Sequence, residues 1–519
     1  MRKIVLVLVL LSLAVVVAVG SFRSRATDAT PLDILKATYA RKRAAPADHA
    51  KFEILQRPFT APQEVTMACL SCHTERGHEV MASSHWNWSR QEYMPGRGIR
   101  TIGKKNVLNN FCIGVAGNLT GCDKCHAGFG YVDQAFDFTN ASNIDCLACH
   151  DNSGTYERTG GGVPAPAVNL NLVAQKVGRP QRSNCGTCHF FGGGGNNVKH
   201  GDLEQAMFEP SRDLDVHMAS DGANLQCVDC HRAPNHQMLG KVYSVSSMNR
   251  DRSTCEQCHG NAPHPDTLLN EHTVKVACQT CHIPAYARAN ATKMTWDWST
   301  AGRLRDGKPY EEHDAQGNIT YASIKGTFTW ATNVTPEYIW FNGTATHYLL
   351  GDQVDADRPV PMNTLFGDHD DPDARIIPVK VHRAVQPYDP GTKLVYQPKL
   401  VGTVAGDGAY WKQFDWNEAA REGMKVAGLP YSGRHGFVPT EMTWPVNHQV
   451  APKAQSLQCN QCHTRTNSRL AGVQGVYLPG RDRNSTVDTL GALALWAVGL
   501  GVVVHGLARA VSTRTRRTA

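Results

Sequence analysis

Outside one recurring spacing, the sequence has almost no cysteine. It contains 17 cysteines in 519 residues, yet all except Cys112 belong to Cys-x-x-Cys pairs, and each pair is followed directly by histidine. Zinc ribbons do not require a histidine at that position each time, and a disulfide framework does not require the repeated spacing. The pattern therefore argues against disulfides and structural zinc.

The repeated unit Cys-x-x-Cys-His is the attachment site of c-type haem. Its two thiols form thioethers with the vinyl groups of the porphyrin, and the adjacent histidine becomes the proximal ligand of the iron. Zinc or a redox dithiol is an alternative for a single motif, but the repetition favours eight haem c groups with their iron. The motifs are Cys69-Cys72-His73, Cys122-Cys125-His126, Cys146-Cys149-His150, Cys185-Cys188-His189, Cys227-Cys230-His231, Cys255-Cys258-His259, Cys278-Cys281-His282 and Cys459-Cys462-His463.

The first seven motifs leave little room for a conventional apolar core. They all lie between Cys69 and His282, glycine and polar residues are frequent between them, and no sustained strand alternation appears. Short helices and loops around stacked porphyrins are therefore expected. The predicted fold is a mainly α, haem-packed multihaem cytochrome c with long irregular loops and a C-terminal transmembrane helix.

The stretch between the seventh and eighth motifs has a different composition, rich in tryptophan, tyrosine and proline. It contains one clear helix signal, with Asp415 as N-cap and Glu418 as its capping-box partner. Gly428 and Pro430 are the stop signals of this helix. We expect the stretch to cover haems and to supply ligands.

The N-terminus has the pattern of a secretory signal peptide. Residues 1–20 begin with Arg2 and Lys3, continue as an apolar run and end on small residues. An uncleaved N-terminal anchor is the alternative, and both place the following residues across the cytoplasmic membrane. Residues 21–58 are interpreted as a linker, and residues 59–485 as the octahaem cytochrome c domain.

The C-terminus carries a second membrane signal. Residues 490–507 have no formal charge and would span about 27 Å as a helix, close to the thickness of a bilayer core. We interpret residues 488–507 as a transmembrane helix, with a buried core helix as the alternative, and residues 508–519 as a basic cytoplasmic tail. The arginines of this tail place the haem domain on the periplasmic side of the cytoplasmic membrane.

Electron-carrying haems need two strong axial ligands, whereas a catalytic haem needs an open or displaceable position. Histidine is the usual second ligand, and 15 of the 23 histidines lie outside the motifs. Sequence alone does not pair them with haems, and histidines such as His49 stay unassigned. The candidates chosen by context are His85, His217, His236, His272, His369, His382 and His448, with His200 and His264 as reserves.

Lys199 is a candidate ligand of another kind. It follows the fourth motif in a loop with four consecutive glycines. A lysine in such a loop is usually solvated, but glycines let the backbone approach a porphyrin closely, and an amine binds iron once it has given up its proton. Ligation and solvation both remain open on these grounds.

Several longer strings make a resemblance specific. The sequence resembles the octahaem tetrathionate reductase family over roughly residues 50–470, within the wider group of hydroxylamine oxidoreductase and the multihaem nitrite reductases. The strings are VTMACLSCH (65–73), NNFCIG (109–114), NIDCLACHDNSGTY (143–156), CGTCHFFGGGGNNVKHGDLE (185–204), DVHM (215–218), VHRAVQPYD (381–389), FDWNEAAREGMKVAGLPYSG (414–433) and TEMTWPVNHQVAPK (440–453).

The resemblance implies a hydroxylamine-oxidoreductase-like fold in which seven haems have two histidine ligands and a catalytic haem has lysine as its distal ligand. By motif match that lysine is Lys199, and the catalytic haem is the one held by Cys122, Cys125 and His126. A cysteine near the catalytic pocket corresponds to Cys112, for which an inert buried thiol is the alternative. The C-terminal anchor departs from soluble members and puts the electron donor in doubt.

The predicted function is a periplasmic reductase of a small inorganic substrate, namely tetrathionate, nitrite or hydroxylamine. Electrons would come from a quinol-linked cytochrome partner at the membrane. A non-catalytic electron conduit and oxidation of thiosulfate or hydroxylamine in the reverse direction are the alternatives. The net charge of +7 identifies no partner, because about sixteen haem propionates would offset it, and no feature indicates nucleic-acid binding. The oligomeric state stays open.

Overall fold

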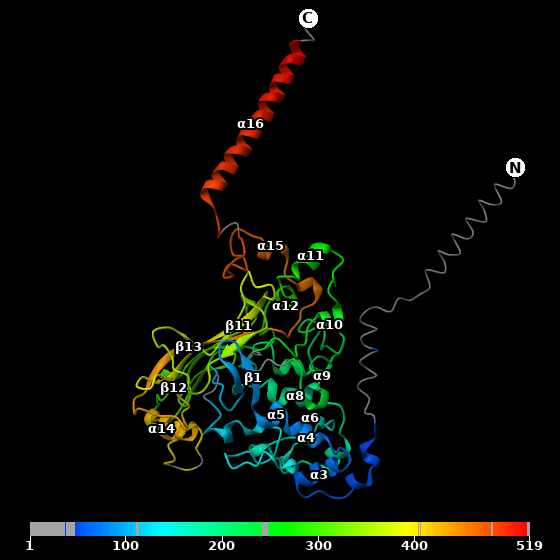
Figure 1. The fold of residues 1–519 in the computed structure, drawn as a ribbon, viewed down its shortest axis with the longest axis vertical. Coiled ribbons are helices and arrows are strands. Elements are labelled where there is room, and N and C mark those ends of the chain that lie inside the picture. The colour runs from blue at the N-terminus through cyan, green and yellow to red at the C-terminus, as the bar shows by residue number, and fades with distance from the viewer. Residues whose placement is uncertain are drawn as a thin grey trace, which may run out of the picture.

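The computed structural model describes residue 37 and residues 47–110, 114–240, 248–402, 404, 406–478 and 481–515. The predicted signal peptide, most of the predicted linker and Cys112 lie outside these residues. In Figure 1 the haem-motif region, coloured blue to green except for the orange helix of the eighth motif, lies beside a β-sheet region coloured green to orange. Helix α16 (Ser485–Thr515) extends away from both regions.

Short helices carry the haem motifs. Residues three apart lie on one side of a helical turn, so both cysteines of a motif can face the same porphyrin. The helices of this region are α3 (Pro62–Cys72), α4 (Arg76–Met81), α5 (Ser84–Asn87), α6 (Leu147–His150), α7 (Leu170–Gln175), α8 (Arg182–His189), α9 (Cys227–Cys230), α10 (Glu256–His259), α11 (Thr267–His272), α12 (Cys278–His282) and α15 (Cys459–Cys462).

The second motif has a different local structure. Its turn is the 3₁₀ helix η4 (Asp123–Cys125), whereas each of the other seven motifs lies on or ends an α-helix. His126 leaves this turn with extended backbone angles, φ −76° and ψ 138°. This motif has the same Cys-x-x-Cys-His pattern as the other seven, but the backbone at its histidine is extended.

The expectation of a haem-packed multihaem cytochrome c fold is confirmed in part: helix accounts for 30% of the structure, but strand, which was not expected, accounts for 18%. The stretch between the last two motifs forms all nine strands of one sheet within the described residues, ordered β4-β5-β6-β3-β11-β13-β9, with β12 and β7 also paired to β11. The strands are β3 (Thr292–Asp297), β4 (Glu311–His313), β5 (Ile319–Ala322), β6 (Gly326–Ala331), β7 (Glu337–Phe341), β9 (Val360–Pro361), β11 (Arg375–Asp389), β12 (Leu394–Val395) and β13 (Gly436–Pro445).

Four further strands form small antiparallel pairs beside this sheet. They are β1 (Arg90–Met94) with β2 (Gly98–Ile102), and β8 (Ala345–His347) with β10 (Asn363–Leu365). The long strand β11 has Cα partners in β13 from Val379–Pro445 to Tyr388–Gly436. This antiparallel pair forms the centre of the sheet and contacts the haem-motif region.

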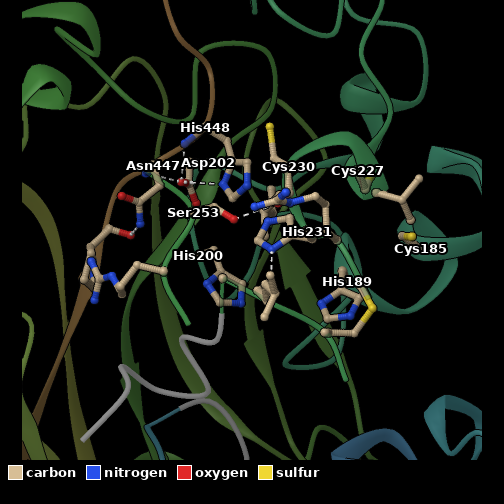
Figure 2. Close-up of a pocket in the computed structure, with 18 of the residues that line it drawn as sticks. Cys185, His189, His200, Asp202, Cys227, Cys230, His231, Ser253, Asn447 and His448 are labelled. Atoms are coloured by element: carbon tan, nitrogen blue, oxygen red, sulfur yellow. Dashed lines mark hydrogen bonds and ion pairs between the residues drawn. The ribbon is translucent and has the colours of Figure 1, made fainter. Parts of the chain in front are cut away.

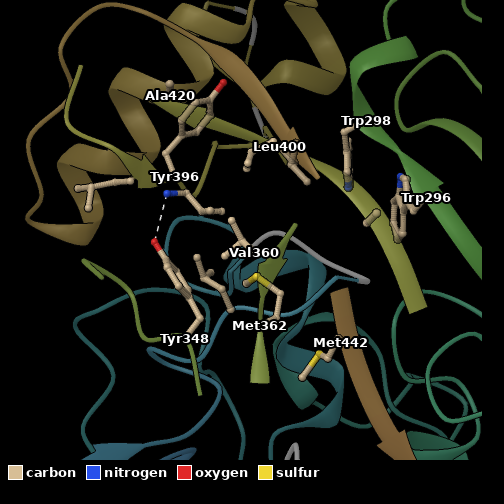
Figure 3. Packing of buried hydrophobic residues seen from close by; sticks show 14 of the residues in the cluster. Trp296, Trp298, Tyr348, Val360, Met362, Tyr396, Leu400, Ala420 and Met442 are labelled. Carbon is tan, nitrogen blue, oxygen red and sulfur yellow. Dashed lines mark hydrogen bonds between the residues drawn. The ribbon is translucent and has the colours of Figure 1, made fainter. Parts of the chain in front are cut away.

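The apolar core of the sheet region packs against the predicted helix. Helix α14 (Trp416–Ala427) begins at Asp415, whose carboxylate accepts hydrogen bonds from two backbone N–H groups, and ends at Gly428 in the left-handed conformation. The helix prediction is confirmed, although Glu418 pairs with Arg421. Figure 3 shows the apolar cluster beneath α14, including Trp298 and Met442. The remaining helix, α13, spans Tyr410–Gln413.

Packing at the N-terminal side begins earlier than the predicted boundary at residue 59. Leu55 is buried in a cluster with Val65 and Leu147, and its carbonyl accepts a hydrogen bond from the Gln175 side chain at 2.9 Å. Residues 47–58, assigned to the linker from their charge and alanine content, therefore belong to the folded region.

Helix α16 (Ser485–Thr515) contains the predicted membrane segment. Among the described residues it is the one helix long and apolar enough to cross a membrane, with a candidate span Ser485–Ser512 of mean hydropathy 2.0. None of that span is buried against the rest of the chain. This exposure argues against the alternative of a buried core helix.

Candidate functional site: a cavity lined by histidine pairs

One large cavity connects all the motifs. Its volume is about 4010 Å³, and all sixteen motif cysteines line it. An ordinary ligand pocket has about 300–1,000 Å³, so the cavity has the volume of roughly four to thirteen such pockets. Seven of the eight motif histidines also line the cavity, and His126 does not.

Seven motif histidines each face another histidine across this cavity. The ring centres of each pair lie 5.9–6.3 Å apart. A metal held at about 2 Å by each of two imidazoles puts their nitrogens about 4 Å apart and their ring centres about 2 Å further. The pairs are His73–His49, His189–His85, His150–His236, His259–His217, His231–His448, His282–His264 and His463–His272.

Hydrogen bonds at Nδ1 orient several of these rings. His150 and His231 contact backbone carbonyls through Nδ1 at 2.8 and 3.0 Å, and His272 does so at 2.8 Å. A histidine that donates through Nδ1 keeps Nε2 available to a metal. The residues therefore fit haem iron both in spacing and in tautomer.

Two of the facing histidines contact carboxylates instead of carbonyls. His236 Nδ1 lies 2.8 Å from Glu79, and His448 Nδ1 lies 3.1 Å from Asp202. Figure 2 shows His448 beside Asp202 and Asn447 in the left half of the view, and His189 and Cys185 in the right half. A carboxylate partner increases the basicity of an imidazole ligand, so these two positions favour the oxidised metal relative to the others.

The structure brings together five of the histidines chosen from the sequence, namely His85, His217, His236, His272 and His448, with motif histidines. It corrects two others, because within the described chain neither His369 nor His382 faces a motif histidine. His369 is half exposed beside Asp370, and His382 is fully buried in strand β11.

Sequence reasoning missed His49 and held His264 only in reserve. His49 lies in the 3₁₀ helix η1 (His49–Lys51), in the stretch interpreted as a linker. His264 follows the sixth motif by five residues but faces the histidine of the seventh. No local signal pairs such residues, because the pairing depends on tertiary structure.

The eighth motif histidine, His126, points into an aromatic cluster. Its Nε2 lies 2.6 Å from the Trp86 carbonyl, and burial lowers its pKa to about 4. In His150, His231 and His272 the hydrogen bond is made by Nδ1, which leaves Nε2 to the metal. In His126 it is Nε2 that makes the hydrogen bond. The surrounding rings lie 4.8–6.0 Å away and belong to Trp86, Trp88, Tyr131, Phe136 and Phe138.

The geometry at His126 contradicts its predicted role as a proximal ligand. The ring lies outside the cavity that Cys122 and Cys125 line, and its Nε2 is engaged with backbone. The extended backbone after η4 and the capture of the ring by aromatic neighbours account for the difference.

Lys199 lines the cavity. Its Nζ lies 4.8 Å from the ring centre of Trp444, and the ring of His200 lies 4.7 Å from the same indole. Lys199 Cδ lies 3.6 Å from the position that a Cβ on Gly192 would take, so glycine permits the lysine chain to cross its own loop closely. The lysine is directed into the cavity rather than out to solvent.

Contacts between motif segments place seven attachment sites in a series. The order along the cavity is first, third, fourth, fifth, sixth, seventh and eighth motif. The contacts are Thr66 Oγ1 to Ile144 O at 2.7 Å, Asn184 Nδ2 to Asp151 O at 2.8 Å, Arg182 N to Gln226 Oε1 at 3.0 Å, Ser253 Oγ to Cys230 O at 2.7 Å, the thiol contact of Cys255 with Cys278, and Leu457 N to Cys281 O at 2.9 Å.

The second motif joins this series at the fourth. The Cys125 sulfur contacts the Cys188 sulfur. Ala127 N also donates to the His85 carbonyl at 3.3 Å. The site of Cys122 and Cys125 is therefore a branch beside the histidine pair of His85 and His189.

The comparisons with known proteins agree with this architecture. Residues 293–466 match the family model "Cytochrome c bacterial", and residues 211–283 match "Cytochrome c7 and related cytochrome c". An uncharacterised protein of Archaeoglobus fulgidus is 25% identical over a match that covers 40% of this chain and 85% of the archaeal one.

A solved structure is much closer to this chain. The crystal structure of octahaem cytochrome c from Shewanella oneidensis is 43% identical, with a TM-score of 0.76, and the match covers 85% of this chain and 99% of that one. Together with the eight motifs and the cavity, this similarity supports eight bound haem c groups with iron. The chain belongs to the octahaem c-type cytochromes.

Proposed function

We propose that this octahaem cytochrome is a reductase of small inorganic substrates, with tetrathionate as the first candidate and nitrite and hydroxylamine as further ones. The reaction takes place at the site of Cys122 and Cys125, with Lys199 as the protein ligand of that haem. The seven histidine pairs hold the haems that carry electrons.

The difference between one site and seven carries this proposal. At each of seven sites two histidines lie at the separation of two axial ligands, so neither axial position is left for a substrate. At the remaining site His126 is turned away and Lys199 lines the cavity. A haem held at this site by Lys199 alone would offer a coordination position to a small molecule.

The chain supplies positive charge around this site. Lys104, Arg158 and Lys124 lie close enough to Cys125 for their charges to act on it. Tetrathionate and nitrite are anions, and a cleft lined by cations concentrates anions. The haem supplies electron transfer and an open coordination position; Lys199 and the cationic residues bind and orient.

The number of haems suits reactions of several electrons. Reduction of tetrathionate to two thiosulfates and of hydroxylamine to ammonium each takes two electrons, and reduction of nitrite to ammonium takes six. The series of attachment sites ends at the eighth motif, and α16 follows that motif in sequence. We therefore place electron entry at the haem of Cys459 and Cys462.

The C-terminal helix α16 and the basic tail determine the proposed orientation of the protein in the membrane. With α16 as an anchor and the basic tail in the cytoplasm, the haem domain stands on the periplasmic side of the cytoplasmic membrane. A quinol-linked cytochrome in that membrane is the proposed electron donor.

Cys112 lies outside the described residues, but its flanks are fixed. Asn110 Nδ2 donates to the His382 carbonyl at 2.8 Å, and Gln386 Nε2 donates to Asn110 Oδ1 at 2.9 Å. A Cβ on Gly114 would lie 1.7 Å from Gln397 Nε2, so the backbone there packs directly on that side chain. We keep Cys112 as a proposed residue of the catalytic pocket.

His264→Met tests the pairing geometry. Methionine in place of the second histidine raises the potential of a haem, here by on the order of 100 mV within the about 0.8 V that axial ligands set. A potentiometric titration should show one haem moved upward. His369→Met is the control and should move none; equal titration curves for both variants would contradict the pairing of His264 with His282.

Turnover of the holo-protein with a reduced dye tests the function directly. Tetrathionate, nitrite and hydroxylamine are compared under the same conditions. Turnover of at least one supports a reductase, and a clear preference identifies the substrate class. No turnover of any of them, with eight haems counted by mass, would favour the alternative of an electron conduit.

A further inference from the structure

A buried lysine lies beneath the loop that carries Lys199. Lys380, in the middle of β11, is fully buried. Its Nζ donates hydrogen bonds to Val198 O at 2.9 Å, to Lys199 O at 3.2 Å and to Thr292 Oγ1 at 2.6 Å. Burial lowers the pKa of Lys380 well below its usual value, because an ammonium group is costly to remove from water. A lysine inside a strand therefore needs hydrogen bonds that offset this cost.

The strand pair β11–β13 holds both ends of Lys199. Lys380 is the Cα partner of Trp444 across this pair. Lys380 bonds to the backbone carbonyl of Lys199, and the Trp444 ring lies 4.8 Å from the Nζ of Lys199. Two neighbouring positions of one rigid sheet thus fix where the lysine chain begins and where its amine lies.

The neighbouring contacts tie the same loop to the sheet region. Thr292 Oγ1, which accepts from Lys380, donates to Asn197 O at 2.5 Å. Gly201 has φ +85°, and a Cβ there would lie 2.7 Å from the Tyr286 ring and 3.1 Å from Lys380 Cδ. The backbone of the loop therefore lies directly on the Lys380 side chain, and glycine is required for that approach.

We propose that Lys380 is a positioning residue for Lys199: it fixes the backbone of the loop so that the Lys199 amine reaches the haem of Cys122 and Cys125. This inference rests on the proposed ligation of that haem by Lys199. Lys380 acts through its hydrogen bonds to the carbonyls of Val198 and Lys199. Strand β11 holds Lys380 in the position from which it makes these bonds.

Lys380→Met tests the proposal in the full-length holo-protein, because methionine keeps the length and apolar stem of the side chain but lacks the ammonium. The expected result is that the absorption and paramagnetic resonance signals of one haem change in the same way as in Lys199→Leu, while the other seven stay as they are. We expect kcat to fall about 10–100-fold, the range for residues that orient a metal ligand.

Thr292→Val is a second variant with a smaller change. It removes one acceptor of Lys380 and the bond to Asn197 but keeps the ammonium, so the same haem should change in the same direction and to a lesser extent. If Lys380→Met does not fold, Thr292→Val alone tests whether Lys380 positions Lys199.

Lys275→Met is the matched control. Lys275 also holds a loop through two carbonyls, those of His369 at 3.0 Å and Asp371 at 2.6 Å, at another place in the chain. It should leave the signals of the haem of Cys122 and Cys125 unchanged.

Three outcomes separate the two proposals. If Lys199→Leu changes no haem, the proposed function fails. If Lys199→Leu changes one haem and both Lys380→Met and Thr292→Val leave it as in the wild type, the positioning role is wrong. If the Lys275→Met control gives the same signals as Lys380→Met, the effect is general destabilisation and the positioning role is likewise wrong.

Discussion

Lys199→Leu is expected to remove turnover while leaving eight haems attached. Leucine keeps the bulk of the side chain but has no amine for the iron. Loss of a direct ligand should exceed the about 10–100-fold cost of losing an orienting contact, so we expect kcat/KM with a reduced dye to fall at least about 100-fold. The spectrum of one haem should change in parallel.

Lys104→Met is the matched control for this prediction. Like Lys199→Leu, it removes one lysine side chain from the cavity lining, and Lys104 Nζ lies 4.5 Å from the ring centre of Trp88. Its charge affects the attraction of anions, so KM should rise while the haem spectrum stays unchanged. A Lys199→Leu protein with wild-type spectrum and turnover would contradict the proposed ligation.

Removal of residues 485–519 is expected to separate quinol-driven from dye-driven turnover. Leu478 is buried, together with Leu470 and Val473, against Tyr338 and Trp340. Seven residue steps connect Leu478 to Ser485, a reach of at most about 25 Å at 3.3–3.6 Å per residue. The eighth attachment site therefore stays close to the start of the membrane segment.

Without α16 the protein should leave the membrane fraction and lose access to its donor. Tethering gives an effective concentration that can raise overall binding by about 100–10,000-fold, so quinol-driven turnover should fall at least about 10-fold. Dye-driven turnover should stay unchanged, because the haem region keeps its contacts. The variant His505→Leu retains the span and should keep both activities; full quinol-driven turnover in the truncated protein would contradict electron entry at this end.

Local signals in the sequence carried the correct predictions. The attachment motifs depend on cysteines three residues apart in one turn, and helix α14 depends on a cap at Asp415 and a stop at Gly428. Each of these features lies within a few residues of chain, so physical rules of local structure are sufficient to find it.

The sheet was missed because its central strand does not alternate. Strand β11 is buried along nearly all of its length, including Lys380 and His382. A strand covered on both faces has no polar face to give a period of two. Pro378 and Pro387 also interrupt the pattern that would indicate a strand.

The ligand pairs could be predicted in type but not in detail. The surplus of histidines predicted two-histidine sites, yet His264 reaches the seventh motif and not the sixth, which only the fold decides. The second motif could not be distinguished from its sequence, because it has the same Cys-x-x-Cys-His pattern as the other seven. Only the structure shows that an aromatic cluster including Trp86 holds His126 away from the cavity. The glycine-rich loop made Lys199 a candidate and the family resemblance predicted it as a haem ligand, which stays a prediction, whereas the contact of its loop with Lys380 needed the structure.

Carbon monoxide binding to the fully reduced holo-protein tests the central claim that one site differs from seven. Spectral titration gives the number of haems that accept the ligand, against a total of eight counted by mass. One haem in eight should bind carbon monoxide in the wild type, and Lys199→Leu should alter the spectrum of that haem alone. Binding at none of the eight haems, or at several of them, would contradict the account.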